Sequence, residues 1–224
     1  VWQAASPPTP GRTSLLTGNV DPAPRFGGCG PTVAVELARL GHKVGLVTWI
    51  GDDDYGRRNL EYLMAAGVDT RGVEVATGQP SPRTLLIYDP SGSATCLYHP
   101  SGSRDQRLSA ATANLAREAR AIALTVSPAH LTQAIVTSRG PKQILAWAVK
   151  ADPDAYPPNL RRELMAAADV VCLNRDEVPF LAEPLSGTPD DPYETIRRAC
   201  RGLLVVTAGA EGCRVAQRDG WASV

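Results

Sequence analysis

The strongest constraint on the fold is a regular alternation of helical segments and apolar strands between residues 109 and 207. Each expected strand is a short and nearly continuous apolar run, and each follows a segment with apolar residues at helical spacing. The expected strands are residues 121–126, 144–149, 170–173 and 203–207, and the expected helices are residues 109–119, 128–137, 158–168, 175–183 and 192–201. This pattern predicts a parallel sheet covered on both faces, whose ligands bind beyond the carboxyl ends of the strands.

The first half of the chain adds a second kind of pattern. Residues 1–26 are rich in Pro, Thr, Ser and Gly and predict an irregular surface segment. A helix from Pro31 to Leu40, a buried strand at 44–50 and a second helix ending before Gly67 then continue the α/β alternation. Residues 73–98 differ, because short strands flank the turn Asp89-Pro90-Ser91-Gly92. They predict a small antiparallel sheet that stands off the main body.

Composition excludes several classes of protein. The 224 residues suit one large domain, or one domain plus a small appendage. The 23 basic residues balance 23 acidic ones, which argues against a nucleic-acid or anionic-membrane binder. The longest clean apolar run, residues 144–149, is far too short to span a membrane, and we expect no signal peptide. The scattered cysteines favour reduced thiols in a cytoplasmic protein over disulfides or a zinc site: Cys29, Cys96, Cys172, Cys200 and Cys213.

A glycine-rich segment, Gly27-Gly28-Cys29-Gly30, directly precedes the first helix. Glycines there let the backbone approach a ligand closely, and a helix start offers free N–H groups. For the glycines alone, an ordinary loop-to-helix joint is the favoured interpretation. It is not a dinucleotide fingerprint, because the third glycine and a preceding strand are missing, and the chain contains no Walker A sequence.

Three further segments follow strands and carry polar or small residues. Asn174 and Glu177 fit a capping box at a helix start, or a carboxylate that holds Mg²⁺ through water. Thr207-Ala208-Gly209-Ala210-Glu211-Gly212 fits a tight turn or a phosphate-binding loop. The acidic turn Asp52-Asp53-Asp54 could bind a cation, but capping of the next helix is the simpler interpretation.

Together, the segments are more specific than any one of them. Their order is Gly27-Gly28, then Gly51-Asp52-Asp53-Asp54-Tyr55-Gly56, then Asn174-x-x-Glu177 and Thr207-x-Gly209-x-x-Gly212. This order resembles the ribokinase/PfkB family of carbohydrate kinases over roughly residues 25–217. The resemblance implies a ribokinase-like three-layer α/β sandwich with a mainly parallel sheet and a small β-lid at about residues 73–98. It also implies that residues 1–224 form one domain that is incomplete at both ends.

The resemblance implies two sets of site residues. The substrate set is Gly27, Gly28, Thr32, Tyr98 (or its neighbour His99) and Asp152. Thr32 stands where the family usually has Asn, and Asp152-Pro153-Asp154 resembles the family's Asp-Pro-Asn. The ATP set is Asn174, Glu177, Thr207, Gly209 and Gly212, with Glu177 placing Mg²⁺ through water and a monovalent cation as a further candidate.

The catalytic residues remain unknown, because the family's Gly-Ala-Gly-Asp motif is expected beyond Val224. The first hypothesis is ATP-dependent phosphorylation of a hydroxyl group of a sugar or nucleoside. The second is a non-catalytic relative that binds sugar or nucleotide without the catalytic base, and a third, weaker one is an unrelated α/β protein such as a dehydrogenase. We also expect a homodimer formed through the lids, since a small isolated sheet is marginally stable.

Overall fold

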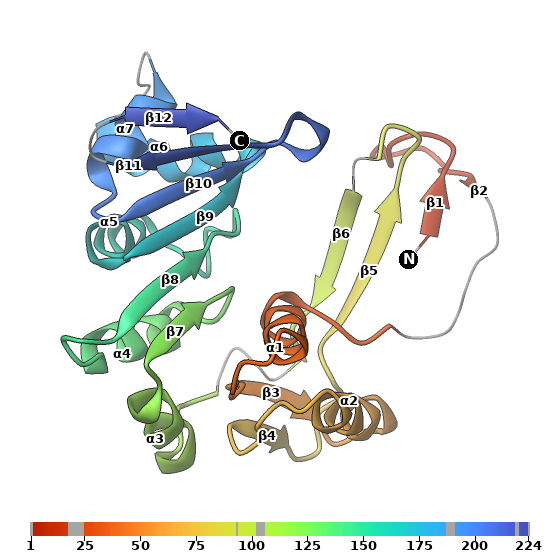
Figure 1. The fold of residues 1–224 in the computed structure, drawn as a ribbon. Helices are drawn as coiled ribbons and strands as arrows, with labels where there is room; N and C mark the ends of the chain where they lie inside the picture. Colours follow the sequence, from red (N-terminus) through yellow and green to blue (C-terminus); the bar gives the residue numbers. More distant parts are fainter. Residues whose placement is uncertain are drawn as a thin grey trace. The chain divides into compact units, whose positions relative to one another are not determined.

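The computed structural model describes residues 2–17, 25–92, 94–101, 106–186, 191–217 and 220–223 (Figure 1). The chain divides into two compact units, Val1–Gln106 and Arg107–Val224, which we call unit 1 and unit 2. Each unit contains a hydrophobic core of its own. The expectation of a single domain over the whole chain stays a prediction. Among the described residues, no helix combines the length and the apolar character needed to cross a membrane.

Unit 2 is built on a six-stranded sheet with the order β12-β11-β10-β9-β8-β7. Four strands are parallel, as the sequence predicts: β7 (Ala121–Leu124), β8 (Ile144–Ala148), β9 (Val170–Asn174) and β10 (Leu203–Thr207). Two antiparallel strands, β11 (Cys213–Gln217) and β12 (Gly220–Ser223), extend the sheet beyond β10. The carboxyl ends of the parallel strands therefore lie at one edge of the sheet.

The helices of unit 2 lie where the sequence predicts them. They are α3 (Ala110–Glu118), α4 (Ala129–Ser138), α5 (Pro158–Ala167), α6 (Val178–Ser186) and α7 (Pro192–Ala199). The Ser109 side chain caps α3 and the Asp191 side chain caps α7 by accepting backbone N–H hydrogen bonds. One expected helix begins differently, because residues Arg175–Glu177 form a 3₁₀ turn, η2, before α6.

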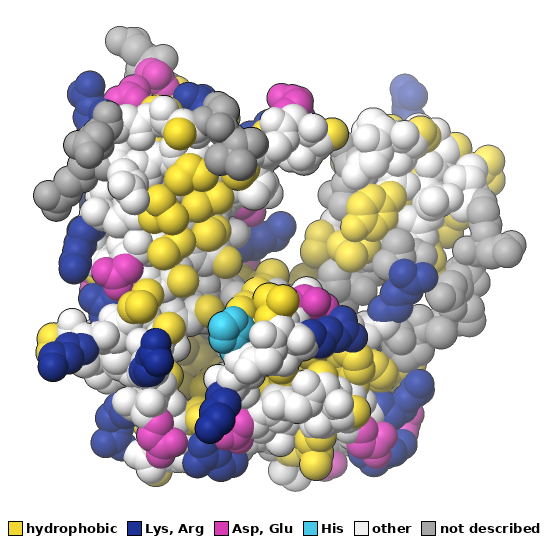
Figure 2. All heavy atoms as spheres, viewed as in Figure 1, with side chains coloured by type: hydrophobic (Ala, Val, Ile, Leu, Met, Phe, Trp, Pro, Cys, Tyr) yellow, Lys and Arg dark blue, Asp and Glu magenta, His cyan; other side chains and the backbone are white. Residues whose placement is uncertain are grey.

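The two faces of this sheet are buried to different degrees. One face packs against α5, α6 and α7 (Figure 1), and its side chains, such as Trp147 and Leu204, are 0% and 1% exposed. The alternate residues, such as Cys172 and Val205, are apolar but only partly buried. Figure 2 shows hydrophobic side chains gathered over this part of the molecule. The nearly continuous apolar runs thus reflect strands with apolar residues on both faces.

Unit 1 contains a β-α-β segment packed on a preceding helix. Helix α1 (Cys29–Arg39) is followed by β3 (Thr48–Gly51), α2 (Asp54–Ala65) and β4 (Val73–Ala76), and β3 pairs with β4 in parallel. Their small core consists of Ala34, Val35, Leu46, Leu63 and Val68. The strand expected at 44–50 begins only at Thr48, and ahead of it Gly45 makes an isolated parallel bridge to Asp69.

A four-stranded sheet, here called the lid sheet, completes unit 1. Its order is β2-β1-β5-β6, with β5 (Arg83–Tyr88) and β6 (Ala94–His99) forming the predicted hairpin. The other two strands, β1 (Trp2–Ala4) and β2 (Leu16–Thr17), correct the expectation of an irregular segment. We predicted that the lid begins at about residue 73, but strand β4 (Val73–Ala76) pairs with β3 and lies outside the lid sheet. Both corrections concern pairings between distant segments, which local sequence patterns do not report.

Candidate functional site

The predicted ATP-side residues of unit 2 gather at the carboxyl ends of β9 and β10. Asn174 is the last residue of β9, and Thr207 is the last residue of β10 and its direct partner in the register. Both residues are exposed. The Thr207 hydroxyl donates to the Leu173 carbonyl oxygen at 3.4 Å. The parallel register thus places an amide and a hydroxyl side by side at the edge where ligands of such sheets bind.

Asn174 and Glu177 form both halves of a capping box. The Glu177 N–H donates to Asn174 Oδ1 at 3.0 Å, and the Asn174 N–H donates to Glu177 Oε2 at 2.9 Å. Glu177 is 6% exposed. The capping interpretation of this pair is therefore confirmed. A carboxylate can accept through both oxygens, so capping through Oε2 is chemically compatible with a water-mediated metal contact through Oε1.

The turn after β10 is a short 3₁₀ segment, η3 (Gly209–Glu211), closed by Gly212. The Ala208 N–H donates to the Gly212 carbonyl oxygen at 2.9 Å, which folds the turn back on itself. Gly212 has φ 85° and ψ −142°, a conformation that is essentially restricted to glycine. The backbone of the turn itself thus requires a glycine at the last position of the Thr-x-Gly-x-x-Gly pattern.

An ion pair that the sequence analysis missed joins the two turns. Arg175 Nη1, in η2, lies 2.6 Å from Glu211 Oε1, in η3. The sequence offered one hint of this ion pair: Arg175 and Glu211 carry opposite charges, and each is adjacent to a motif residue. The pair is exposed and so contributes little stability, but it brings η2 and η3 together around Asn174 and Thr207.

Asp152 lies one strand further along the same edge, in the loop after β8. Its Oδ1 accepts hydrogen bonds from the N–H groups of Asp154 and Ala155, both at 3.0 Å. Tyr156 anchors the end of this loop, because its hydroxyl donates to the Thr125 carbonyl oxygen at 2.7 Å and its ring packs against Trp147. One oxygen of Asp152 thus holds its own loop, and its predicted role in substrate binding stays a prediction.

The predicted substrate residues of unit 1 lie at the start of α1. Gly28 is the N-cap of this helix, and no side chain caps it. A Cβ atom on Gly27 would lie 3.5 Å from the Thr32 hydroxyl oxygen, so these two residues are neighbours. Gly27, Gly28 and Thr32 are all exposed. This helix start therefore presents backbone N–H groups and a hydroxyl to solvent.

Tyr98 and His99 lie on β6 of the lid sheet. Tyr98 is 54% exposed and pairs with Thr84 in the register, and His99 pairs with Arg83. Successive residues of a strand point to opposite faces. Tyr98 and His99 therefore cannot both face the same ligand from this strand, and the choice between them stays open to experiment.

Within the acidic turn, Asp53 caps α2 as expected. Its Oδ1 accepts from the Gly56 N–H at 2.8 Å and from the Ser81 hydroxyl at 2.6 Å. Arg83 also approaches this carboxylate, at 3.2 Å from Oδ2. Ser81 and Arg83 lie 28 and 30 residues further along the chain, so no local pattern announces the contact. This junction is therefore one that local sequence patterns do not predict.

The donor groups at the β9–β10 edge suit a nucleotide and Mg²⁺. Hydroxyl, amide and backbone N–H groups match phosphate oxygens, and Mg²⁺ prefers oxygen ligands and usually keeps several waters. Within the described ranges, no group of three or more His, Cys, Asp or Glu side chains could hold a metal ion by itself. A metal at this edge would accordingly depend on ligand phosphates as well as on Glu177.

All five cysteines are free thiols. Cys29 and Cys96, both in unit 1, are exposed, whereas Cys172 and Cys213 are partly buried and Cys200 is buried. Burial raises the pKa of Cys172 and raises the pKa of Cys200 to about 12. Reactivity toward thiol reagents therefore belongs mainly to the two exposed cysteines.

Comparison with curated proteins finds several sugar kinases. The chain is 28% identical over 225 residues to fructokinase-1 of Oryza sativa, covering 88% of this chain and 66% of that protein. It is 27% identical over 214 residues to 5-dehydro-2-deoxygluconokinase of Clostridium tetani, covering 87% of this chain and 63% of that protein. The chain thus spans slightly less than two thirds of the length of these relatives.

Comparison with solved structures confirms the predicted ribokinase-like α/β fold. The ribokinase of Cryptococcus neoformans in complex with ADP matches with a TM-score of 0.80 at 21% identity, over 100% of this chain and 74% of that one. The nucleoside kinase of Burkholderia thailandensis in complex with inosine matches with a TM-score of 0.74 at 19% identity, over 95% and 66%. The family model for pfkB carbohydrate kinases matches residues 19–223, which is most of the sequence. The chain therefore belongs to the pfkB family of carbohydrate kinases.

Proposed function

We propose that this chain is part of an ATP-dependent kinase that phosphorylates a hydroxyl group of a sugar or a nucleoside. The observation that carries the proposal is the pairing of Asn174 with Thr207 at the carboxyl ends of β9 and β10. Around this pair the structure gathers the Glu177 carboxylate and the glycine turn of η3. Family membership supports the same reaction, as do neighbours solved with ADP or with ATP and Mg²⁺.

In this proposal the residues of unit 2 position the phosphate donor. Asn174, Thr207 and the N–H groups of the η3 turn would bind phosphate oxygens, and Glu177 would hold a water ligand of Mg²⁺. The metal ion would supply positive charge to the phosphates. The residues of unit 1, Gly27, Gly28 and Thr32, would bind acceptor hydroxyls, with Tyr98 and Asp152 as further contacts. Catalysis by such a site consists mainly of positioning and electrostatic stabilisation.

The test is a panel of phosphate acceptors with ATP and Mg²⁺, using the full-length protein. The panel holds ribose, fructose, a keto-deoxy sugar acid and a nucleoside, and acceptor-dependent ADP release is measured by a coupled assay. We expect one acceptor class to give turnover that requires both ATP and Mg²⁺. Binding of ATP and an acceptor by calorimetry without turnover would favour a non-catalytic relative instead. If the protein shows no binding and no turnover with any acceptor, both the kinase function and the binding function are overturned.

We also propose that the protein forms a homodimer through its lid sheets. In the β5–β6 register Leu85 lies opposite Leu97, and Ile87 is two residues further along the same face. Leu97 is 55% exposed, although an apolar face of so small a sheet needs a cover. A second copy of the same face is self-complementary and gives a closed dimer.

Light scattering on two matched variants tests the dimer. Leu97→Lys places a charge on the apolar face and should give the mass of a monomer at micromolar concentration. Tyr98→Lys is the control, because Tyr98 is similarly exposed, at 54%, but lies on the opposite face. It should keep the mass of the dimer. A wild-type protein with the mass of a monomer, or dissociation of both variants, would contradict the proposal.

A further inference from the structure

One carboxylate connects three segments at the base of the lid sheet. Asp53 follows β3, caps α2 through the Gly56 N–H, and accepts the Ser81 N–H at 3.0 Å and the Ser81 hydroxyl at 2.6 Å. Ser81 is 7% exposed, and its oxygen in turn accepts the Gly51 N–H at 3.0 Å. The end of β3, the start of α2 and the segment that enters β5 are therefore joined at a single point.

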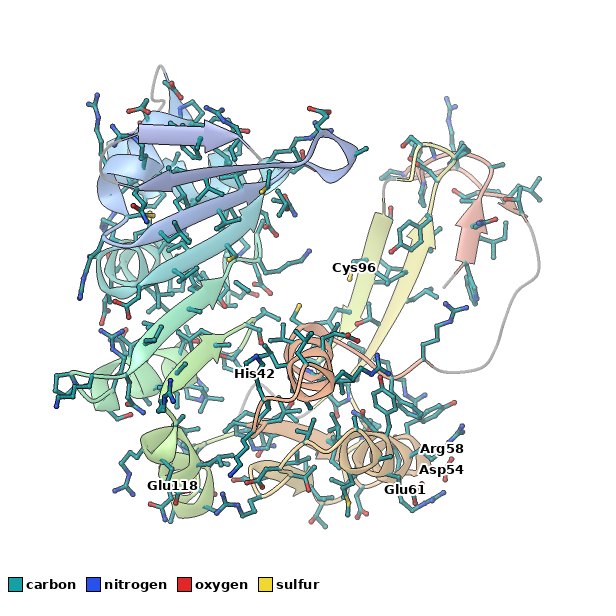
Figure 3. All side chains as sticks on the ribbon, viewed as in Figure 1. His42, Asp54, Arg58, Glu61, Cys96 and Glu118 are labelled. Atoms are coloured by element: carbon teal, nitrogen blue, oxygen red, sulfur yellow. The ribbon has the colours of Figure 1, made fainter. Side chains whose placement is uncertain are left out.

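The neighbouring acidic residue behaves differently. The Asp54 side chain is 62% exposed and pairs with Arg57 and Arg58 on its own helix. Figure 3 shows Asp54, Arg58 and Glu61 together on the outer side of α2. The charge of Asp54 thus acts within one helix, whereas Asp53 bridges elements that are far apart in the sequence.

Two glycines allow the Ser81 segment to sit this close. A Cβ atom on Gly51 would lie 2.1 Å from the Ser81 nitrogen, which no side chain can occupy. A Cβ atom on Gly56 would lie 2.2 Å from the Gly51 carbonyl oxygen and 2.9 Å from the Ser81 hydroxyl oxygen. The two glycines of Gly51-x-Asp53-x-x-Gly56 therefore leave room for Ser81, and the aspartate binds Ser81 rather than a cation.

The charge of Arg83 and a hydrogen bond from the segment that leaves β6 strengthen this junction. Burial alone would raise the pKa of Asp53, but hydrogen bonds from Ser81, Gly56 and Arg83 outweigh it and hold the pKa below its usual range. The guanidinium of Arg83, the first residue of β5, also lies 4.3 Å from the centre of the Tyr55 ring. Where the chain leaves β6, the Ser101 hydroxyl donates to the Pro80 carbonyl oxygen. Both connections of the β5–β6 hairpin thus meet beside Asp53.

We propose that Asp53 is a positioning residue that fixes the direction in which the lid sheet leaves the body of unit 1. It acts through Ser81 and Arg83 and does not contact the substrate. The kinetic consequence rests on the proposed function: a lid held at the wrong angle weakens binding of the phosphate acceptor while the ATP side is unaffected. Asp53 thereby acquires a role that is separate from capping α2.

Hydrogen exchange measured by mass spectrometry tests the junction without reference to activity. Ser81→Ala removes one donor and one acceptor but leaves the cap of α2 in place, and Asp53→Asn keeps a capping oxygen but loses the charge. Both should speed exchange at the base of the lid sheet, residues 79–83 and 99–101, by about tenfold, as expected when a hydrogen bond to a charged group is lost. Exchange in the strands of unit 2 should stay unchanged.

Two matched controls isolate the effect. Asp54→Asn makes the same change at the exposed neighbour, and Ser91→Ala removes a hydroxyl that also donates to an aspartate at 2.6 Å, but in the hairpin turn. Neither should alter exchange at the base of the lid sheet, residues 79–83 and 99–101. Equal exchange in wild type and Ser81→Ala, or uniformly faster exchange over both units, would overturn the proposal. Should Asp53→Asn not fold, Ser81→Ala decides the question alone.

A kinetic measurement on the full-length protein separates this inference from the proposed function. Ser81→Ala should raise KM for the acceptor by about tenfold and leave KM for ATP and kcat close to wild type. An equal rise of both KM values, or a fall of kcat alone, would contradict a lid-positioning role. If the wild type phosphorylates no acceptor, the proposed function fails together with this kinetic consequence, and hydrogen exchange still decides whether Asp53 anchors the lid sheet.

Discussion

At the scale of single residues, Glu177 combines an observed role as a helix cap with a proposed role in placing Mg²⁺. Its Oε2 accepts the Asn174 N–H at 2.9 Å, so the side chain is fixed at the end of β9. A capping carboxylate held in this way is also well placed to order a water ligand of a metal ion. The two roles differ in what they require, because a cap needs only an accepting oxygen, whereas a metal site needs the negative charge.

Glu177→Gln separates these roles. Gln also serves in a capping box, so the melting temperature should change little. If the carboxylate organises Mg²⁺ and phosphate, turnover of the full-length protein should fall by about 10²–10³-fold, the usual loss for one electrostatic contact in the transition state. Steady-state kinetics and thermal unfolding measure both effects. Asp176→Asn is the matched control, since the adjacent Asp176 side chain is 90% exposed and its loss should leave turnover unchanged. Unchanged turnover in Glu177→Gln would leave the helix cap as its only role.

At the scale of elements, the turn η3 depends on one unusual backbone conformation. Gly212 adopts φ 85° and ψ −142°, which an L-residue with a side chain avoids, whereas Gly209 has φ 61° in the milder left-handed region. Gly212→Ala should therefore destabilise the protein by about 2–3 kcal/mol. Gly209→Ala should cost about 1 kcal/mol. Urea unfolding midpoints measure both changes.

Gly140 supplies the control for these two substitutions. Its backbone is not left-handed, and an added Cβ atom would make an ordinary contact, 3.6 Å from the Gln143 side-chain oxygen. Gly140→Ala should be neutral or slightly stabilising. A loss of stability at Gly140 as large as that at Gly212 would show that the cost is not specific to the turn.

The elements also show how far the sequence could predict this structure. The strands β7 to β10 were predictable because nearly every residue in them is apolar, and the capping box was predictable because Asn174 and Glu177 have the required spacing. The pairing of Trp2–Ala4 with β5 was not, because it joins segments about 85 residues apart with no local pattern. The contact of Asp53 with Ser81 was hidden for the same reason.

At the scale of the whole molecule, the two hydrophobic cores differ greatly in size. The core cluster of buried residues in unit 1 consists of Ala34, Val35, Leu46, Leu63 and Val68, whereas that of unit 2 draws on most of its strands and helices. Because burial of apolar area is the main source of stability, unit 1 should be the less stable of the two.

Two matched leucine-to-alanine substitutions test whether the two units differ in stability. Leu63 in unit 1 and Leu164 in unit 2 are both 0% exposed, so Leu63→Ala and Leu164→Ala should each cost about 2–5 kcal/mol. Because each side chain belongs to the core of its own unit, hydrogen exchange should accelerate only in the unit that carries the substitution. Acceleration throughout the chain after either substitution would show instead that the two units unfold as one.

The distribution of thiols has a practical consequence for measuring movement of the lid sheet. Cys29 lies at the start of α1 and Cys96 lies on β6, where Figure 3 shows it, and both are exposed, while Cys172, Cys200 and Cys213 are partly or fully buried. Nitroxide spin labels would therefore attach preferentially to the two exposed thiols without any engineered cysteine. Dipolar spectroscopy between those labels reads the distance from the first helix to the lid sheet, with and without ligand. The natural sequence thus already contains a pair of labelling points for following this part of the molecule in solution.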